Sequence, residues 1–529
     1  MSFWKKRQTK QPRKLISKPD SPILDTTKSQ TIDNEIKVTL EQIKKIFQKD
    51  VDFATREFQI AHKIPAVAVF ISSLVDPDKI NQDIIQCLQD KPLPKETSKR
   101  ITQTILEDII SHCNVVEEMQ LSTMLEGILR GKTVILIEGE LHSLIFDTYK
   151  PEKRSSIQPE TERVVRGPRD GFIEQMMTNI SLLRYRLPVP EFRAEQMEIG
   201  EITKTRIAIC YMDGIASKEL VEEVRKRLSD ITIDRILDAG YIEGFIQDNK
   251  YSPFPQIQNT ERPDKAVGNI LEGRVVILVD GTPFALIAPA TFNQFYHTSE
   301  DYNERWLMTS TIRIIRFMAL IFSLTFSSFY VTVLSYHPEL IPAQFVVAAA
   351  SGRVGVPFPV AVEVLLMEAA MEILREATVR MPQQVGGALS IVGVLVVGQA
   401  AVQAGFVSPI TVVIIAMSTI GSFATPSYNA ATAFRLLRFP LIVLAGSFGL
   451  LGLAVGLMLV INHMVSLRSF GVPYMSPVAP GNFEGIKDTF IRAPLNWMRK
   501  RPAETNPQSA GRLNAKNNSS SDKGGNSDG

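Results

Sequence analysis

Long apolar stretches occupy only one part of this 529-residue chain, and they constrain its fold more than any other feature. No uncharged apolar window of about 18 residues occurs before Phe317, whereas such windows dominate from there to Val465. A helix needs about 20 mostly apolar residues to cross a bilayer. The mean hydropathy of +0.04 is therefore an average over a polar region and an apolar one. We predict an N-terminal region in water followed by an α-helical, multi-span membrane domain at 305–470.

The apolar region contains four predicted spans and one charged helix. The spans are 317–334, 386–406, 408–424 and 441–465. The charged helix, PVAVEVLLMEAAMEILREATVR, occupies 359–380. Basic residues flank the first and last spans, so the positive-inside rule puts both flanks in the cytosol if four segments cross. A fifth crossing by the charged helix would place the basic C-terminal flank outside, so we expect that helix to lie at the interface or partly buried. A polar channel wall is the alternative.

The polar region repeats itself. MLEGILRGKTVILIEGELHSLI, which starts at Met124, matches AVGNILEGRVVILVDGTPFALI, which starts at Ala266. A second pair of similar segments starts at Val67 and Ile207. Both copies keep the same order, about 140 residues apart, and each reads as helix, Gly, strand, acidic-Gly turn and strand. This order predicts two related α/β subdomains.

The remaining boundaries follow from composition. We expect a disordered basic arm, two α/β subdomains, a juxtamembrane segment after the membrane domain, and a disordered tail. These occupy 1–32, 33–155, 156–304, 471–502 and 503–529. The arm has no apolar core of the kind that a secretory signal requires. The tail is rich in Asn, Ser, Gly and Asp, a composition that buries too little surface to order itself.

Composition argues against several functional classes. The formal net charge is only +2, which is atypical of a generally basic nucleic-acid-binding protein. Three cysteines without a CxxC pair and six histidines without metal-ligand spacing predict neither a disulfide scaffold nor a metal site. No serine-nucleophile motif of the GxSxG type occurs. We therefore expect no enzymatic activity, no cofactor and no nucleic-acid partner.

One segment resembles a phosphate-binding loop without meeting its requirements. Gly131-Lys132-Thr133 reads GKT, but the preceding Gly127 is one residue too close for the phosphate-loop pattern. The predicted order is helix, GKT and strand, so no helix N-terminus faces a phosphate there. We interpret the segment as a structural turn.

Charged side chains of the 359–380 helix are the main functional candidates. Glu368, Glu372, Arg375 and Glu376 fall at i, i+4, i+7 and i+8 and therefore share one face, and Glu363 lies nearer the start of the helix. A charge inside a bilayer is costly unless it is paired or faces water. We interpret these residues as lining or gating a channel, or as contacting another subunit.

Polar and small residues in the other apolar segments complete the candidate set. Gln399 and Gln403 lie four residues apart in the second span, where they can bond across helices or face water. Pro426 and Asn429 belong to a stretch that breaks the helical run, and irregular backbone at membrane depth must be buried in protein or face water. Small residues that allow close helix packing are Gly398, Gly452 and Gly456.

Five motifs in a fixed order make the chain resemble a known family. They are VRGPRDGFIEQMMTNISLLRYRL at 165–187, SYHPELIP at 335–342, REATVRMP at the end of the charged helix, GQAAVQAGFVSP at 398–409 and PSYNAATAFRLLRFP at 426–440. This series resembles the A subunit of the spore germinant receptors, the GerA family of endospore-forming bacteria. The resemblance covers about Asp33 to Pro502.

The resemblance implies a nutrient-receptor subunit in the inner spore membrane, with its N-terminal region in the cytosol. It implies a transporter-like B subunit and a lipoprotein C subunit as partners, homo-oligomerisation, and contact with the lipid bilayer. In such receptors the small-molecule pocket is assigned mainly to the B subunit, whereas the A subunit is thought to form or gate an ion-conducting path. A non-conducting scaffold that relays the signal is the alternative. A transporter would show inverted repeats in its membrane half, and we find none there.

Overall fold

The chain divides into two compact units. The structure, a computed structural model, describes residues 21–91, 100–106, 115–150, 158–380, 396–481 and 483–512. The first unit comprises 1–155, 175–197 and 208–213, and the second comprises 156–174, 198–207 and 214–529. The first division between the units falls after residue 155, and two later segments, 175–197 and 208–213, belong to the first unit.

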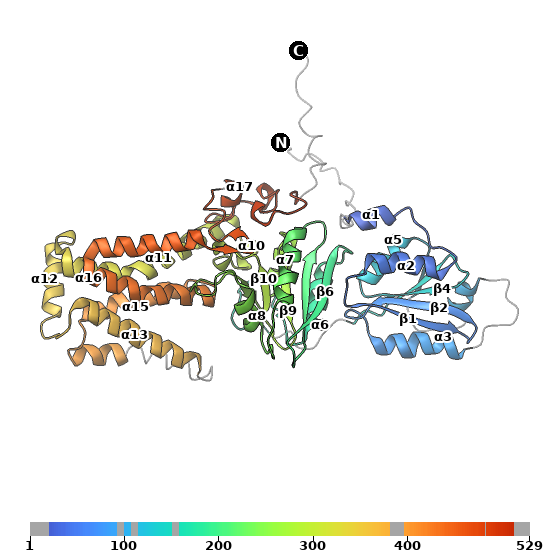
Figure 1. The fold of residues 1–529 in the computed structure, drawn as a ribbon, viewed down its shortest axis with the longest axis horizontal. Coiled ribbons are helices and arrows are strands. Elements are labelled where there is room, and N and C mark those ends of the chain that lie inside the picture. Colours follow the sequence, from blue (N-terminus) through green and yellow to red (C-terminus); the bar gives the residue numbers. More distant parts are fainter. Residues whose placement is uncertain are drawn as a thin grey trace, which may run out of the picture. The chain divides into compact units, whose positions relative to one another are not determined.

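The first sheet has five strands in the order β1-β2-β4-β5-β3, and its pairs are antiparallel. They are β1 (Phe53–Ile60), β2 (Ile64–Ile71), β3 (Val115–Glu118), β4 (Thr133–Ile137) and β5 (Ser143–Phe146). Helices α2 (Ile36–Ile46) and α5 (Leu121–Leu129) cover one face, and η1 (Lys79–Gln86) with α3 (Cys87–Asp90) covers the other (Figure 1). Two short helices are α1 (Pro22–Thr27) and α4 (Ile101–Thr104).

The second sheet repeats this order as β6-β7-β9-β10-β8. Its strands are β6 (Phe192–Ile199), β7 (Thr205–Met212), β8 (Gln258–Thr260), β9 (Val275–Val279) and β10 (Ala285–Ala288). The accompanying helices are α6 (Met176–Arg186), α7 (Lys218–Ser229), α8 (Ala239–Ile246) and α9 (Pro263–Leu271). The shared strand order agrees with the predicted duplication. Because the described pairs are antiparallel, the subdomains are built around hairpins rather than parallel βαβ units.

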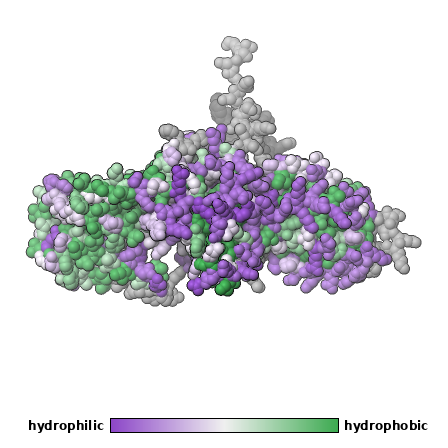
Figure 2. Space-filling view, viewed as in Figure 1, coloured by the Kyte–Doolittle hydropathy of each residue, from purple (hydrophilic) through white to green (hydrophobic). Residues whose placement is uncertain are grey.

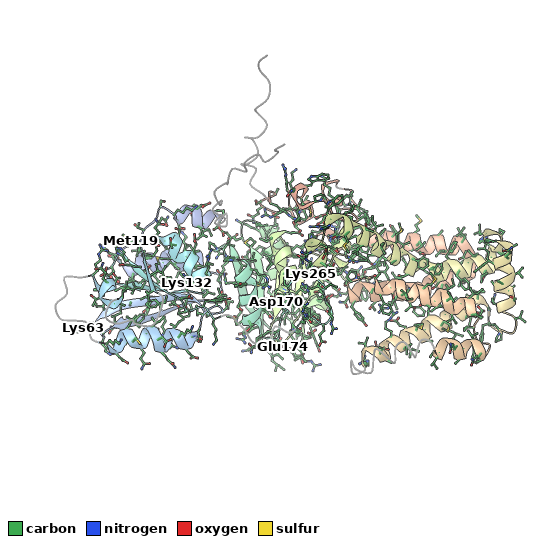
Figure 3. All side chains as sticks on the ribbon, turned by 180° about the vertical axis from the view of Figure 1, so that it is seen from behind. Lys63, Met119, Lys132, Asp170, Glu174 and Lys265 are labelled. Atoms are coloured by element: carbon green, nitrogen blue, oxygen red, sulfur yellow. The ribbon has the colours of Figure 1, made fainter. Side chains whose placement is uncertain are left out.

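The predicted glycine turns lie where the repeat placed them. Gly139 and Gly281, at φ 81° and 90°, lie in the β4–β5 and β9–β10 turns, where a side chain would strain the backbone. Gly131, at φ 76°, lies between α5 and β4. Lys132, labelled in Figure 3, therefore precedes a strand rather than a helix. The GKT segment is a structural turn, as predicted.

Two segments that we expected to be disordered are partly ordered. The Ser21 hydroxyl caps α1 by accepting from the Leu24 amide, and it donates to the Glu191 carboxylate at 2.6 Å. At the other end, the Gln508 amide donates to the Ile215 carbonyl at 2.9 Å. The expectation of disorder was wrong for 21–32 and 503–512. Composition indicates how much surface a segment can bury by itself, but it does not include the hydrogen bonds that the segment makes with the rest of the fold. Residues 1–20 and 513–529 lie outside the described residues.

The C-terminal region is helical. Its main elements are α10 (Glu300–Asn303), α11 (Trp306–Tyr336), η4 (Pro338–Leu340), α12 (Ala343–Gly352), α13 (Val360–Val379), α15 (Pro409–Phe423) and α16 (Tyr428–Ser466). Short elements flank them: η3 (Phe292–Phe295), β11 (Arg468–Ser469), β12 (Val472–Pro473), α17 (Phe483–Ile486), η5 (Leu495–Trp497) and η6 (Ala503–Thr505). By length and composition, α11 and α16 can each cross a membrane. Of the predicted second span, 396–403 is helical and the part before residue 396 lies outside the described residues.

Helix α16 is a hairpin of two antiparallel arms. At Gly449 the backbone leaves the helical region, with φ 62° and ψ −138°. Phe434 and His463 both lie beside Phe254, with ring centroids 5.2 and 6.0 Å from its own. A straight helix would separate those two residues by about 43 Å, at 1.5 Å per residue. The single span predicted at 441–465 is therefore wrong, because it runs across the tip of the hairpin.

The bundle of α11, α13, α15 and α16 is apolar outside and buries polar side chains, as well as apolar ones, inside. Figure 2 shows hydrophobic residues gathered over this part of the surface. Exposed side chains include Ile321, Leu366, Ile373, Ile420, Leu451 and Met458. Buried side chains include Ser327, Ser328, Thr332, Glu363, Thr411 and Ser418. This is the reverse of a helical bundle in water and is typical of helices whose outer surface meets lipid.

Replacing Gly449 by Ala tests the hairpin tip. A Cβ at this position would lie 3.0 Å from the Tyr336 ring, on a backbone conformation that is essentially restricted to glycine. We expect the free energy of unfolding to fall by about 1–3 kcal/mol, measured by thermal unfolding of the detergent-solubilised chain. The matched control is Gly244→Ala in α8, where a Cβ meets nothing within 4 Å and helix propensity improves. Equal effects of the two changes would contradict the tight turn.

Candidate functional site: the charged helix of the bundle

Helix α13 buries two of its carboxylates inside the bundle and exposes several of its large apolar side chains. It starts after Pro359, whose fixed φ suits a helix start, and packs against α11, α15 and α16. Glu363 and Glu368 are 0% and 5% exposed, whereas Leu366 and Ile373 are 49% and 71% exposed. The helix is therefore an integral part of the bundle. We expected a helix that lies at the interface or is partly buried. Only its last residues, among them Glu376 and Arg380, are exposed in this way.

Glu363 lies at the start of α15. Arg353 donates from Nε to Oε1 of this carboxylate at 3.0 Å. The Ser408 amide and the Thr411 hydroxyl donate to Oε2, each at 3.1 Å. Ser408 is also the N-cap of α15, since its hydroxyl accepts from the Thr411 amide. A buried anion thus sits where the helix dipole favours negative charge, and a guanidinium neutralises it.

Glu368 connects four helical segments. The Ser327 hydroxyl of α11 donates to one carboxylate oxygen at 2.8 Å, and Nη1 of Arg438, on the first arm of α16, lies 3.4 Å from the other. Nη2 of Arg438 also donates to the Ser418 carbonyl of α15 at 3.3 Å. Nε of Arg438 has no hydrogen-bond partner among the described residues. The pair is buried on both sides, so each charge depends on the other.

A second ion-pair rung follows one turn along α13. Glu372 accepts from Arg375 at 2.8 Å and from Arg435 of α16 at 3.3 Å. Arg375 also lies over the Phe423 ring, 5.2 Å from its centroid. Arg435 and Arg438 lie three residues apart on α16, and Glu368 and Glu372 lie four residues apart on α13. Arg435 faces Glu372, and Arg438 faces Glu368. The two helices are therefore joined by a ladder of two ion pairs, which we call the Glu–Arg ladder.

The other predicted residues are distributed around this ladder. Glu376 pairs with Arg380 at the exposed end of α13. Gln399 and Gln403 are exposed, so the structure does not bring them to the ladder. Pro426 lies in the turn between α15 and α16, and Asn429 lies in the first turn of α16. Buried glycines at helix contacts are Gly398, facing Val412, and Gly452 and Gly456, facing the first arm of α16.

Sequence reasoning included Arg375 but missed the other arginines of the site. Arg353, Arg435 and Arg438 were not among the predicted functional residues. The available signal was the i, i+3 spacing of Arg435 and Arg438, which complements the i, i+4 spacing of Glu368 and Glu372. Nothing in the sequence places the two helices side by side, so the pairing itself could not be derived.

The bundle is anchored on the second sheet subdomain by an aromatic junction. Phe254, Phe292 and Tyr474 surround Phe434, close to the start of α16. A polar network borders these rings, in which Arg313 of α11 donates to Asp301 at 2.9 Å and to Asp488 at 2.8 Å. Burial raises the pKa of Asp301, but the Arg313 and Arg316 guanidinium groups together outweigh it and leave the pKa below its ordinary value. The carboxylate is therefore charged at neutral pH.

Comparison with known proteins shows the family to which the chain belongs. The family model described as "Bacillus/Clostridium GerA spore germination protein" matches residues 41–504. "Spore germination protein KA" of Bacillus subtilis (strain 168) is 43% identical over 468 residues, covering 88% of this chain and 85% of that protein. "Spore germination protein A1" of the same strain is 36% identical over 457 residues, covering 86% and 92%.

A solved structure is similar to part of the chain. It is the crystal structure of the N-terminal domain of the A subunit of the Bacillus megaterium spore germinant receptor GerK3. The two sequences are 34% identical, the match covers 50% of this chain and 98% of the GerK3 chain, and the TM-score is 0.41. The duplicated sheets and the bundle with its apolar exterior define a membrane-associated protein of two regions. The family match is specific, and the chain belongs to the GerA family of spore germination proteins.

Replacing Glu368 by Gln tests the ladder. The change leaves Arg438 buried without its counter-charge, so the free energy of unfolding should fall by about 3–5 kcal/mol. Adding Arg438→Met should recover much of the loss, because an apolar side chain needs no partner. Thermal unfolding in lipid nanodiscs measures both. Glu376→Gln, in the exposed pair, is the matched control and should change stability little; a loss as large as that of Glu368→Gln would count against the ladder.

Proposed function

We propose that this chain is the A-type subunit of a nutrient-germinant receptor in the inner membrane of the spore. The proposal rests on membership of the GerA family and on the bundle with its apolar exterior. In this role the sheet subdomains lie in the cytosol and the bundle lies in lipid. A transporter-like B subunit and a lipoprotein C subunit complete the complex, and the chain assembles with copies of itself.

The contacts of the bundle support a topology with both ends of the membrane domain on one side. Tyr336, at the end of α11, donates to the Gly446 carbonyl near the hairpin tip, at the end of the bundle far from the aromatic junction. The first arm of α16 starts beside Phe254 at the junction, reaches that far end at Gly449, and the second arm returns. The hairpin adds one crossing to the five-span count that includes α13, and the resulting even number returns the chain to the side from which it started. Basic flanks on the same, cytosolic side then agree with the positive-inside rule.

We infer that the Glu–Arg ladder gates an ion path rather than lining it. The observation that carries this inference is the pairing of Glu368 with Arg438, both nearly inaccessible. A carboxylate that is already neutralised by a guanidinium offers a passing cation little attraction, whereas a pair between two helices can hold one arrangement of them. Opening therefore requires α13 and α16 to exchange these contacts for others. The alternative is a non-conducting scaffold in which the same ladder only holds the bundle together.

Potassium release from spores distinguishes a gate from a non-conducting scaffold. We expect Glu372→Gln, which weakens one rung without emptying the buried Glu368 site, to raise potassium release in the absence of nutrient. If the closed state loses about 1.4 kcal/mol, the open population rises roughly tenfold. The double change Glu372→Arg with Arg435→Glu restores the pair in reverse and should return release toward normal.

Control variants show whether a change in potassium release comes from the ladder. Glu376→Gln removes a carboxylate from the same helix outside the ladder and should leave release unchanged. Release that stays normal in Glu372→Gln spores, at normal protein levels, would overturn the gate. A purified oligomer that carries no current in a planar bilayer, with or without Glu372→Gln, would favour the scaffold.

A further inference from the structure

A polar cavity lies within the second compact unit, between the second sheet subdomain and the C-terminal segment. It has two adjoining compartments of about 440 and 540 Å³. Both are bordered by Glu272, Gln294, His297, Tyr302, Arg501 and Arg512. Volumes of this size are those of small-molecule sites in proteins. The cavity is distant in sequence from the charged helix and has no part in the gate proposed above.

Two buried polar atoms at the cavity have no protein partner. Gln258 is 2% exposed; its Nε2 donates to the Gln294 carbonyl at 2.9 Å, but its Oε1 has no partner among the described residues. Arg274 is 4% exposed; it donates from Nη1 to Asn269 at 3.1 Å and to Glu272, while its Nε has no partner there. Leaving a buried polar atom unsatisfied costs about 1–3 kcal/mol. Both atoms belong to residues that border the cavity but have almost no accessible surface themselves, so a ligand meets them only after a small shift of the side chains around them.

The smaller compartment is rich in positive charge. Its basic lining residues are Arg274, Lys487, Arg499, Lys500, Arg501 and Arg512. Its acidic lining residues are Glu272, Asp488 and Glu504. Glu272 pairs with Arg274 and Arg512, Asp488 pairs with Arg313, and burial raises the pKa of Glu504 above its ordinary value. The acidic groups therefore leave a positive excess in the compartment.

The larger compartment is closer to neutral and contains groups that direct a ligand. Lys265 of α9, labelled in Figure 3, borders it and pairs with Glu162 at 2.6 Å. Burial, with Arg313 nearby, lowers the pKa of His297 to about 3, so its ring is neutral and Nε2 donates to the Thr489 carbonyl at 3.2 Å. Since side-chain oxygens of Asp264, Asn269 and Gln294 border this compartment, it suits a hydroxyl or amino group.

We propose that this cavity binds a small molecule that carries an oxyanion, either a phosphate or a carboxylate, together with a hydrogen-bond donor. The oxyanion lies in the smaller compartment among its basic lining residues, because guanidinium and oxyanion form strong charge-assisted hydrogen bonds. The donor group lies in the larger compartment, which Gln258 and Gln294 border. A phospholipid headgroup carries the same chemistry as a soluble phosphate, so the source of the oxyanion is left to the experiment.

Occupancy of the cavity acts on the base of the bundle. One wall is the C-terminal segment, whose Asp488 accepts from the Tyr302 hydroxyl and from Arg313 of α11, both at 2.8 Å. The opposite wall includes α9. A ligand that touches both walls therefore stabilises one placement of the C-terminal segment beside α11, and it shifts the population of any state in which that placement changes.

The test uses the full-length chain in nanodiscs and follows its thermal unfolding midpoint, which a ligand of the folded state raises. In the first arm, neutral phosphatidylcholine nanodiscs are titrated with inorganic phosphate or with citrate. In the second arm, the nanodiscs contain phosphatidylglycerol and the buffer contains no phosphate. Arg274→Gln removes the buried donor. Lys487→Gln with Arg499→Gln removes two exposed charges at the mouth and preserves folding. Arg468→Gln, an exposed arginine outside the cavity, is the matched control.

We expect a saturable rise in the midpoint for the unmodified chain and for Arg468→Gln, with affinity at least about tenfold weaker in the mouth variant. A response in the first arm identifies a soluble oxyanion, and a response only in the second identifies a lipid headgroup; sensitivity to the mouth variant supports the site in either case. No saturable response in either arm, or equal affinities of the mouth variant and Arg468→Gln, would overturn the proposal. None of these readouts depends on ion release or germination.

Discussion

Charges inside an apolar-coated bundle must be paired, and the helical region of this protein is organised around that requirement. Glu363, Glu368 and Glu372 each meet an arginine from another element: Arg353 beyond α12 and two arginines of α16. Breaking the Glu368–Arg438 pair, which is buried on both sides, strands a charge in surroundings that cannot solvate it. The ladder therefore fixes which faces of α13 and α16 meet, and apolar packing alone would leave that choice open.

The hairpin of α16 makes this pairing possible. Its first arm carries Arg435 and Arg438 along α13, and its second arm packs Gly452 and Gly456 against the first. With no side chain at these two positions, the arms approach closely enough for the returning chain to remain inside the bundle. Gly449 makes the reversal in a backbone conformation that other residues rarely adopt. The apolar sequence on either side of it is continuous, so a hydropathy profile registers one long segment.

The sequence contained the repeat, the division into a polar and an apolar region, and the charged face of α13, because each depends on neighbours along the chain. Gly131, Gly139 and Gly281 were predictable for the same reason. The partners of Glu363 and Glu368 were not, since Arg353 and Ser327 reach them through packing that no local pattern encodes. The order of residues 503–512 was missed because it comes from hydrogen bonds to a preformed surface, such as that of Gln508 to Ile215.

The aromatic junction and the ladder are consecutive features of one helix. Phe434 packs among Phe254 and Phe292 of the second sheet subdomain, and the next residue, Arg435, begins the ladder. A helix transmits displacement along its axis because its backbone hydrogen bonds and packed side chains resist deformation. A movement at the aromatic junction is therefore passed along the first arm of α16 to Arg435 and Arg438, the two arginines of the ladder.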